Sequence, residues 1–106
     1  MNYFLDHDTS RTSARGVLRL ESVDAYEAVF GRATRALSQA EGSYTLDLSG
    51  VTLMNSSGIR ALANLVLLAK RHGTSLILHG SSSVPWQHKT MASLGALYDG
   101  LQIRLA

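Results

Sequence analysis

Two adjacent hydroxyl groups, those of Ser56 and Ser57, stand between Asn55 and Gly58 where an apolar helical pattern begins. At a helix start, a Ser or Asn side chain accepts hydrogen bonds from free backbone N–H groups and contributes roughly 0.5–2 kcal/mol. Gly58 permits close packing or an unusual backbone angle. The same position suits phosphorylation, because a phosphate of about −1.5 to −2 charge is favoured by the helix dipole and the free N–H donors. The turn therefore serves as a cap, as a modification site, or as both.

Other reactive side chains form no recognisable catalytic constellation. The chain has no cysteine, no GxxxxGK[ST] phosphate loop and no GxSxG elbow. Its histidines lack metal-ligand spacing, and no two of them lie one helical turn apart; they are His7, His72, His79 and His88. A Ser–His–Asp arrangement would have to be assembled by folding. We therefore expect a protein that is not an enzyme and that holds no metal or cofactor.

The length of the chain favours a single small domain, residues 1–106, which is large enough to bury one core. The formal net charge is +2, and the basic residues are scattered, with the densest run at Lys70–His72. Nucleic-acid binding is not expected, because it would need a positive stripe with stacking aromatic residues. The start MNYFLDHDTS differs from a signal peptide, and no apolar run approaches the ~20 residues that span a membrane. We expect a soluble cytoplasmic protein without a membrane segment.

Apolar periodicity predicts strands that alternate with helices. Strands are expected at 2–8, 16–20, 44–48, 75–78 and 101–105, with a polar turn at 9–13. Helices are expected from Ser22, as the N-cap, to Glu41-Gly42, from Asn55 to His72, and around His88–Tyr98. The order β-β-α-β-α-β-α-β predicts an α/β fold with a mostly parallel mixed sheet. In such sheets functional groups tend to follow the carboxyl ends of strands, which is where the Asn55 turn falls.

The helix after Asn55 carries the clearest pattern. Its expected core stripe consists of Ile59, Leu62, Ala63, Val66 and Ala69. Lys70 and Arg71 suit the negative end of the helix dipole. Gly73 is a natural residue to follow the last turn, because the left-handed conformation is accessible to glycine.

The run LDLSGVTLMNSSGI, Leu46–Ile59, with its helix and the β-β-α order before it, resembles the STAS domain, the fold of anti-sigma-factor antagonists. The resemblance extends over nearly the whole chain. The NSSG turn and the loop VPWQHK, Val84–Lys89, are similar to those of a subgroup of stand-alone bacterial STAS proteins. The resemblance implies the STAS fold and a role in signal transduction by partner switching, with transcription regulation as its output.

In the STAS family the turn usually reads DSSG or DSTG. The resemblance implies that the first serine, here Ser56, is phosphorylated by a partner kinase and dephosphorylated by a PP2C-type phosphatase; Ser57 is the second choice. Asn55 stands where the family usually has Asp, and Arg19 stands where the second strand often carries an acid. Arg19 is either an exposed strand residue or a contact for an anion near Ser56.

The outer face of the same helix is a candidate partner surface. Ala61 and Leu68 fall roughly opposite its core stripe, so the helix is apolar on more than one side. Trp86 is a second candidate anchor, because tryptophan is enriched at interfaces, and the favoured alternative is that it packs on the sheet edge. The candidate contact residues are Asn55, Ser57, Gly58, Arg60, Ala61, Leu68 and Trp86.

These patterns lead to one main functional hypothesis and two alternatives. The main hypothesis is a non-catalytic regulatory module that binds a kinase-type anti-sigma factor or another signalling protein through Asn55–Gly58 and the following helix, switched by phosphorylation of Ser56. The first alternative is a constitutive scaffold or oligomerising subunit, such as a homodimer, without phosphoregulation. The second is a domain that binds an anion or nucleotide through Arg19 and the turn.

Overall fold

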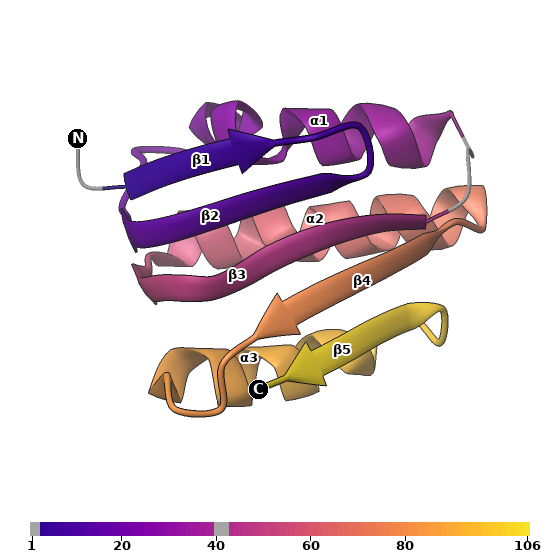
Figure 1. Cartoon of the computed structure of the whole chain (residues 1–106). Coiled ribbons are helices and arrows are strands. Elements are labelled where there is room, and N and C mark those ends of the chain that lie inside the picture. The colour runs from indigo at the N-terminus through magenta and orange to yellow at the C-terminus, as the bar shows by residue number, and fades with distance from the viewer. Residues whose placement is uncertain (1–2, 40–42) are drawn as a thin grey trace.

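The computed structural model describes residues 3–39 and 43–106 and contains one five-stranded sheet with three α-helices (Figure 1). The elements are β1 Tyr3–His7, β2 Arg11–Leu18, the 3-10 turn η1 Asp24–Tyr26, α1 Glu27–Ser38, β3 Ser43–Met54, α2 Ser56–His72, β4 Ser75–Gly80, α3 Pro85–Gly95 and β5 Leu101–Leu105. The strands lie side by side in chain order. β1 pairs antiparallel with β2, and the three remaining pairs are parallel. The predicted α/β fold and its element order are confirmed.

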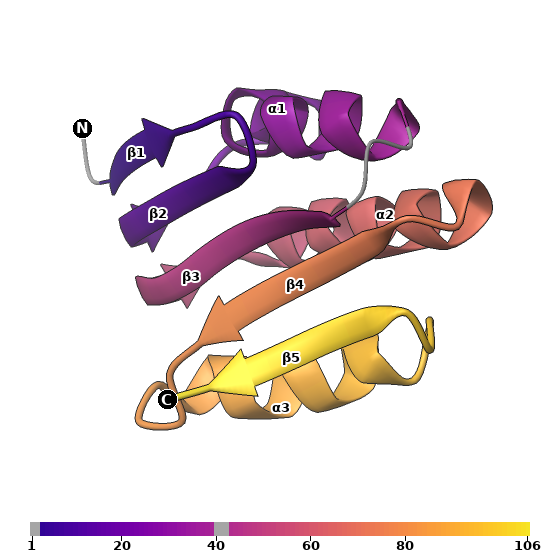
Figure 2. The ribbon, with the colours of Figure 1, turned by 45° about the vertical axis from the view of Figure 1, so that its right-hand side comes forward.

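All three α-helices cover the same face of the sheet (Figures 1 and 2). Each parallel strand is added on the same side of the previous one, and connections of one hand then carry every helix across the same face. The core lies between the sheet and this helical layer. Its central strand contributes Tyr44, Leu46, Leu48 and Val51, all at most 2% exposed, and they belong to one buried cluster with α2 residues such as Leu62 and Val66.

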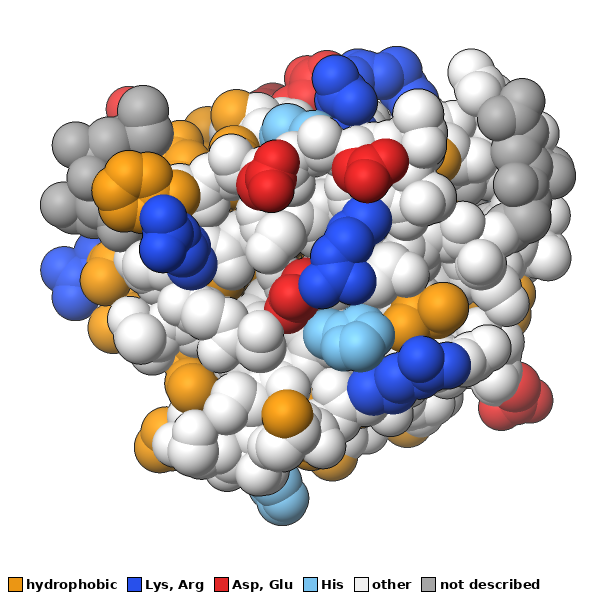
Figure 3. Space-filling view, in the orientation of Figure 1, with side chains coloured by type: hydrophobic (Ala, Val, Ile, Leu, Met, Phe, Trp, Pro, Cys, Tyr) orange, Lys and Arg blue, Asp and Glu red, His pale blue; other side chains and the backbone are white. Residues whose placement is uncertain are grey.

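On the opposite face of the sheet, no helix of the described residues covers the strands, and this face carries polar side chains (Figure 2). Strand register aligns one residue from each strand in a row across this face: Asp6, Ser13, Asp47, His79 and Arg104. Arg11 makes an ion pair with Asp47, with 2.6 Å between Nη2 and Oδ2. Side chains of both signs are interspersed here (Figure 3). Alternation along the strands thus separates an apolar face under the helices from a charged face.

Several predicted boundaries were wrong by a few residues. β2 begins at Arg11, so residues 11–13 pair with β3 instead of forming a turn, and Leu20 lies beyond the strand. β3 continues past Leu48 to Met54. The Glu41-Gly42 end predicted for the first helix lies outside the described residues, and α1 ends at Ser38. Gly73 does end α2 with a left-handed φ of 67°, as predicted.

The last helix begins at Pro85, three residues earlier than predicted, because the PWQ sequence forms its first turn. Proline suits this position, where its missing N–H has no intrahelical partner. Gln87 is fully buried, and its Nε2 donates to the carbonyl oxygens of Leu48, at 2.6 Å, and Val51, at 2.8 Å. Its Oε1 accepts from the Ser81 N–H at 2.7 Å. Gln87 therefore fastens α3 to the middle of β3.

Candidate functional site

Asn55 is the N-cap of α2, and its side chain joins three segments of the chain. Its Oδ1 accepts a hydrogen bond from the Gly58 N–H at 3.0 Å, while its Nδ2 donates to the Leu20 carbonyl at 2.8 Å. Its backbone N–H donates to the Leu18 carbonyl at 3.1 Å. The amide therefore caps α2 and ties it to the loop after β2. A carboxylate would keep the cap but lose the donor that Leu20 receives.

Tyr26, the last residue of η1 and directly before α1, completes this network. Its hydroxyl lies 2.6 Å from Asn55 Oδ1, 3.1 Å from the Leu18 carbonyl and 3.4 Å from the Leu20 N–H. The ring stacks on Phe30 with 5.9 Å between centroids. Burial raises the pKa of the Tyr26 phenol above its ordinary value. The neutral hydroxyl thus holds the starts of α1 and α2 together, and Tyr26 is only 1% exposed.

Ser56 occupies the first position of α2 and is exposed. Among the hydrogen bonds of the described residues, none involves its hydroxyl, because Asn55 supplies the cap. Ser57 is half-buried. Of the two uses suggested by the sequence, capping thus belongs to Asn55, and the Ser56 hydroxyl remains accessible to solvent.

Gly58 is buried in a place with no room for a side chain. A Cβ atom there would lie 2.6 Å from the Tyr26 hydroxyl oxygen and 2.5 Å from Met54 Cγ. Such distances are far below van der Waals contact, so close packing is the reason for glycine. As a contact candidate, Gly58 lies under the surface, with Ser56 and Ser57 more open to solvent.

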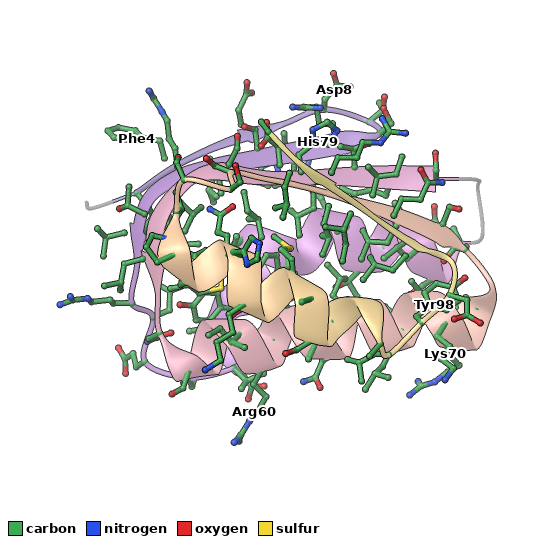
Figure 4. All side chains as sticks on the ribbon, turned by 90° about the horizontal axis from the view of Figure 1, so that it is seen from below. Phe4, Asp8, Arg60, Lys70, His79 and Tyr98 are labelled. Carbon is green, nitrogen blue, oxygen red and sulfur yellow. The ribbon has the colours of Figure 1, made fainter. Side chains whose placement is uncertain are left out.

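The two candidate arginines are both exposed. Arg19 directly follows β2, whose last residue pairs with Met54, so the register brings Arg19 beside the start of the Asn55 turn. Arg60 lies in the first turn and a half of α2 and points away from the sheet (Figure 4). Both cations therefore belong to the same end of the molecule as Ser56.

The apolar candidates on α2 are oriented differently from the prediction. Ala61 is buried, and Leu68 is half-buried; both line a groove against α1. The leucine of α2 that is exposed is Leu67, at 43%. The predicted stripe was rotated, because Leu65 is buried where Ile59 and Ala63 are only half-buried.

Trp86 is half-buried and packs against the core, and its indole N–H donates to the Val51 carbonyl at 3.0 Å. The geometry thus gives Trp86 a role in attaching α3 to β3. Its remaining exposed surface leaves the contact role a prediction.

The comparisons agree with this architecture. A family model described as "Mlab, STAS domain" matches residues 5–98, which include the Asn55 turn and all of α2. The chain belongs to the STAS-domain family. The search of curated proteins found no match.

STAS domains form an anti-sigma-factor-antagonist-like family of generally non-catalytic regulatory proteins, and the domain type is associated with protein–protein interaction. Within the described parts of this STAS domain, no helix is long and apolar enough to cross a membrane. No group of three or more His, Asp or Glu side chains in those parts is placed to hold a metal ion.

Sequence reasoning missed Tyr26, which supports the turn, and Gln87, which attaches α3 to β3. Tyr26 fits the apolar periodicity of the first helix, and nothing in its spacing points to a partner 29 residues away. Gln87 was noted only within a family-like loop. A glutamine directly before a predicted helix gives no local signal that it will be buried, so only the fold shows its three hydrogen bonds.

Proposed function

We propose that this STAS domain is a regulatory module that binds a signalling protein through Asn55–Gly58 and the exposed side of α2. The observation that carries this proposal is that two adjacent residues of the turn have different roles. Asn55 caps the helix, while the adjacent Ser56 is exposed and its hydroxyl makes no hydrogen bond among the described residues. Ser56 can therefore change its chemistry without loss of the cap.

Phosphorylation of Ser56 by a partner kinase is the proposed switch, and a PP2C-type phosphatase reverses it. The phosphate adds about −1.5 to −2 charge at neutral pH. The fold tolerates that charge, because the first turn of α2 presents the positive end of the helix dipole and free N–H groups. A partner docked on the turn has to accommodate the same charge in its own surface, so the modification weakens the complex.

Arg19 and Arg60 are the proposed contacts for this anion or for an acidic partner group. Both are exposed, and both lie at the end of the molecule that carries Ser56. A guanidinium donates paired hydrogen bonds to a phosphate or carboxylate. The cation at position 19, where relatives often carry an acid, thus favours an anionic group beside the turn.

A kinase-type anti-sigma factor is the proposed partner, and transcription regulation the output. This assignment is supported by the family to which the chain belongs. The second candidate function is a constitutive scaffold or homodimer. It is favoured by one observation: the Asn55 amide, in place of the acid usual in the family, is fully used in packing the turn.

The two functions differ in their response to charge at position 56. Intact-mass and phosphosite analysis of the protein purified from its own host should find phosphate on Ser56. Ser56→Asp should reduce partner capture, while Ser56→Ala should retain it. An unmodified Ser56 together with normal capture by Ser56→Asp would favour the scaffold, and light scattering would then show whether the chain self-associates.

A further inference from the structure

A solvent-open groove of about 370 Å³ runs between α1 and α2 on the side of the helices away from the sheet. Its floor is apolar and is formed by Val23, Tyr26, Phe30, Ala61, Leu65 and Leu68. Leu68 is half-buried, so part of this floor is open to water in the isolated chain. Apolar surface left between two helices is suited to contact with another apolar surface.

The groove has a charge at each end. The helices run in the same direction, because Tyr26 at the start of α1 contacts Asn55 at the start of α2, and Thr74 after α2 contacts the Leu37 carbonyl at 3.5 Å near the end of α1. Asp24 and Glu27 therefore lie at the end near Ser56. Arg71 lines the opposite end.

We propose that this groove binds an amphipathic helix of the protein partner, with a basic residue against Asp24 and Glu27 and an acidic residue against Arg71. A groove between two parallel helices accepts a third helix by ridge-into-groove packing. From Ala61 to Arg71 the wall is about 15 Å long at 1.5 Å per residue, which matches about three turns. Apolar residues of the ligand at i, i+3, i+4 and i+7 face such a floor.

Shape and charge favour this occupant over a second copy of the chain. A second copy presents the same concave surface between its own α1 and α2, and two concave surfaces do not fill one another. The acid–base asymmetry also gives a ligand helix one preferred direction. Ser57, one helical turn before Ala61, joins the groove to the phosphorylation turn, so one partner can contact both.

This inference rests on the proposed function, since it describes how the partner of the module is held, but different residues carry it. The probe is a capped twelve-residue peptide with leucines at i, i+3, i+4 and i+7, two lysines at one end and two glutamates at the other. Two control peptides keep the leucines and carry lysines at both ends or glutamates at both ends. Binding to the full chain is followed by amide chemical shifts at low salt.

The expected result is saturable binding of the mixed-charge peptide, with the largest shifts at groove residues. For each charge of a control peptide that faces a like charge of the groove, the affinity should be about two- to fivefold lower than that of the mixed-charge peptide. Arg71→Glu should shift the preference to the peptide with lysines at both ends. Arg104→Glu, on the open sheet face, should leave the order unchanged.

The inference would be overturned by a lack of saturation at millimolar peptide, by shifts centred outside the groove, or by the same peptide preference in Arg71→Glu as in the wild type. Concentration-dependent shifts at groove residues without peptide would also overturn it, since a second copy would then occupy the groove. If Ser56→Asp left both peptide binding and partner capture unchanged, the proposed phosphorylation switch would be refuted and the proposed groove would be supported.

Discussion

The Tyr26 hydroxyl lies 2.6 Å from Oδ1 of Asn55, and this contact joins the starts of two helices that are separated by β3 in the chain. The same Oδ1 accepts from the Gly58 N–H, and the same amide donates to the Leu20 carbonyl. Position 55 therefore works as a structural joint with both of its polar atoms in use. The residue next to it, Ser56, is left exposed, and the functional proposal depends on that contrast.

Asn55→Asp should destabilise the fold, although Asp is usual at this place in the family. The carboxylate retains the cap and gains from the helix dipole, but it cannot donate to the Leu20 carbonyl and faces that oxygen with a negative charge. We expect a loss of about 1–2 kcal/mol in the free energy of unfolding, measured by urea denaturation.

Asn64→Asp is the matched control, because Asn64 is exposed on the same helix. Its effect should stay within about 0.5 kcal/mol. Equal stability of Asn55→Asp and the wild type would contradict this prediction, because the dipole gain would then offset the whole loss at Leu20.

Tyr26→Phe should remove the hydroxyl that contacts Asn55 and Leu18 while keeping the ring that stacks on Phe30. The lost hydrogen bonds should lower the free energy of unfolding by about 1–2 kcal/mol. A double-mutant cycle with Asn55→Ala should give a loss smaller than the sum of the two single losses, because both changes remove the same contact. Additive losses would mean that the two side chains act independently.

The wild type should also lose stability above about pH 10, the ordinary pKa of tyrosine. Burial raises the pKa of Tyr26, so the folded state holds the phenol proton more tightly than the unfolded state does. The stabilising contribution is complete below pH ~10 and falls as the pH rises through the folded pKa. In Tyr26→Phe this part of the alkaline loss should be absent in pH-dependent urea denaturation.

Gln87→Leu should be among the more damaging single changes in the chain. It leaves the Leu48 and Val51 carbonyls without the Nε2 donor and the Ser81 N–H without its acceptor. We expect a loss of at least about 2 kcal/mol by urea denaturation. Gln102→Leu, at an exposed position of β5, is the control and should change stability little. Similar effects of the two variants would refute the fastening role of Gln87.

Asp47→Asn should reduce the acid sensitivity of the fold. Burial alone would raise the pKa of Asp47, but the Ser49 hydroxyl and N–H, with the charges of Arg11 and His79, lower it below its ordinary value. A lowered folded pKa contributes stability that is present above the unfolded pKa of about 3.9 and is lost as the pH falls through the folded value. The variant should therefore lose less stability than the wild type between about pH 5 and 3. Equal acid sensitivity of the variant and the wild type, measured by urea denaturation at each pH, would contradict this.

The sequence was enough to predict the element order, the parallel sheet, α2 and its glycine stop, because these depend on local periodicity and terminal residues. It was not enough to choose which polar residue caps α2, since Asn55 and Ser56 are both good caps locally. That choice is made by Tyr26 and Leu20, which the fold brings from elsewhere in the chain. The buried face of α2 could not be predicted from the sequence either, because Ala61 and Leu65 are buried by α1, not by the sheet alone.

The most direct test of the central claim compares partner capture from host lysate by the wild type, Ser56→Ala and Ser56→Asp, with quantitative mass spectrometry. Ser43→Asp is the control, since Ser43 is exposed at the opposite end of β3 from the Asn55 turn. The account predicts that one set of proteins is captured equally by the wild type, Ser56→Ala and Ser43→Asp, and is lost with Ser56→Asp. Equal capture by Ser56→Asp would contradict it.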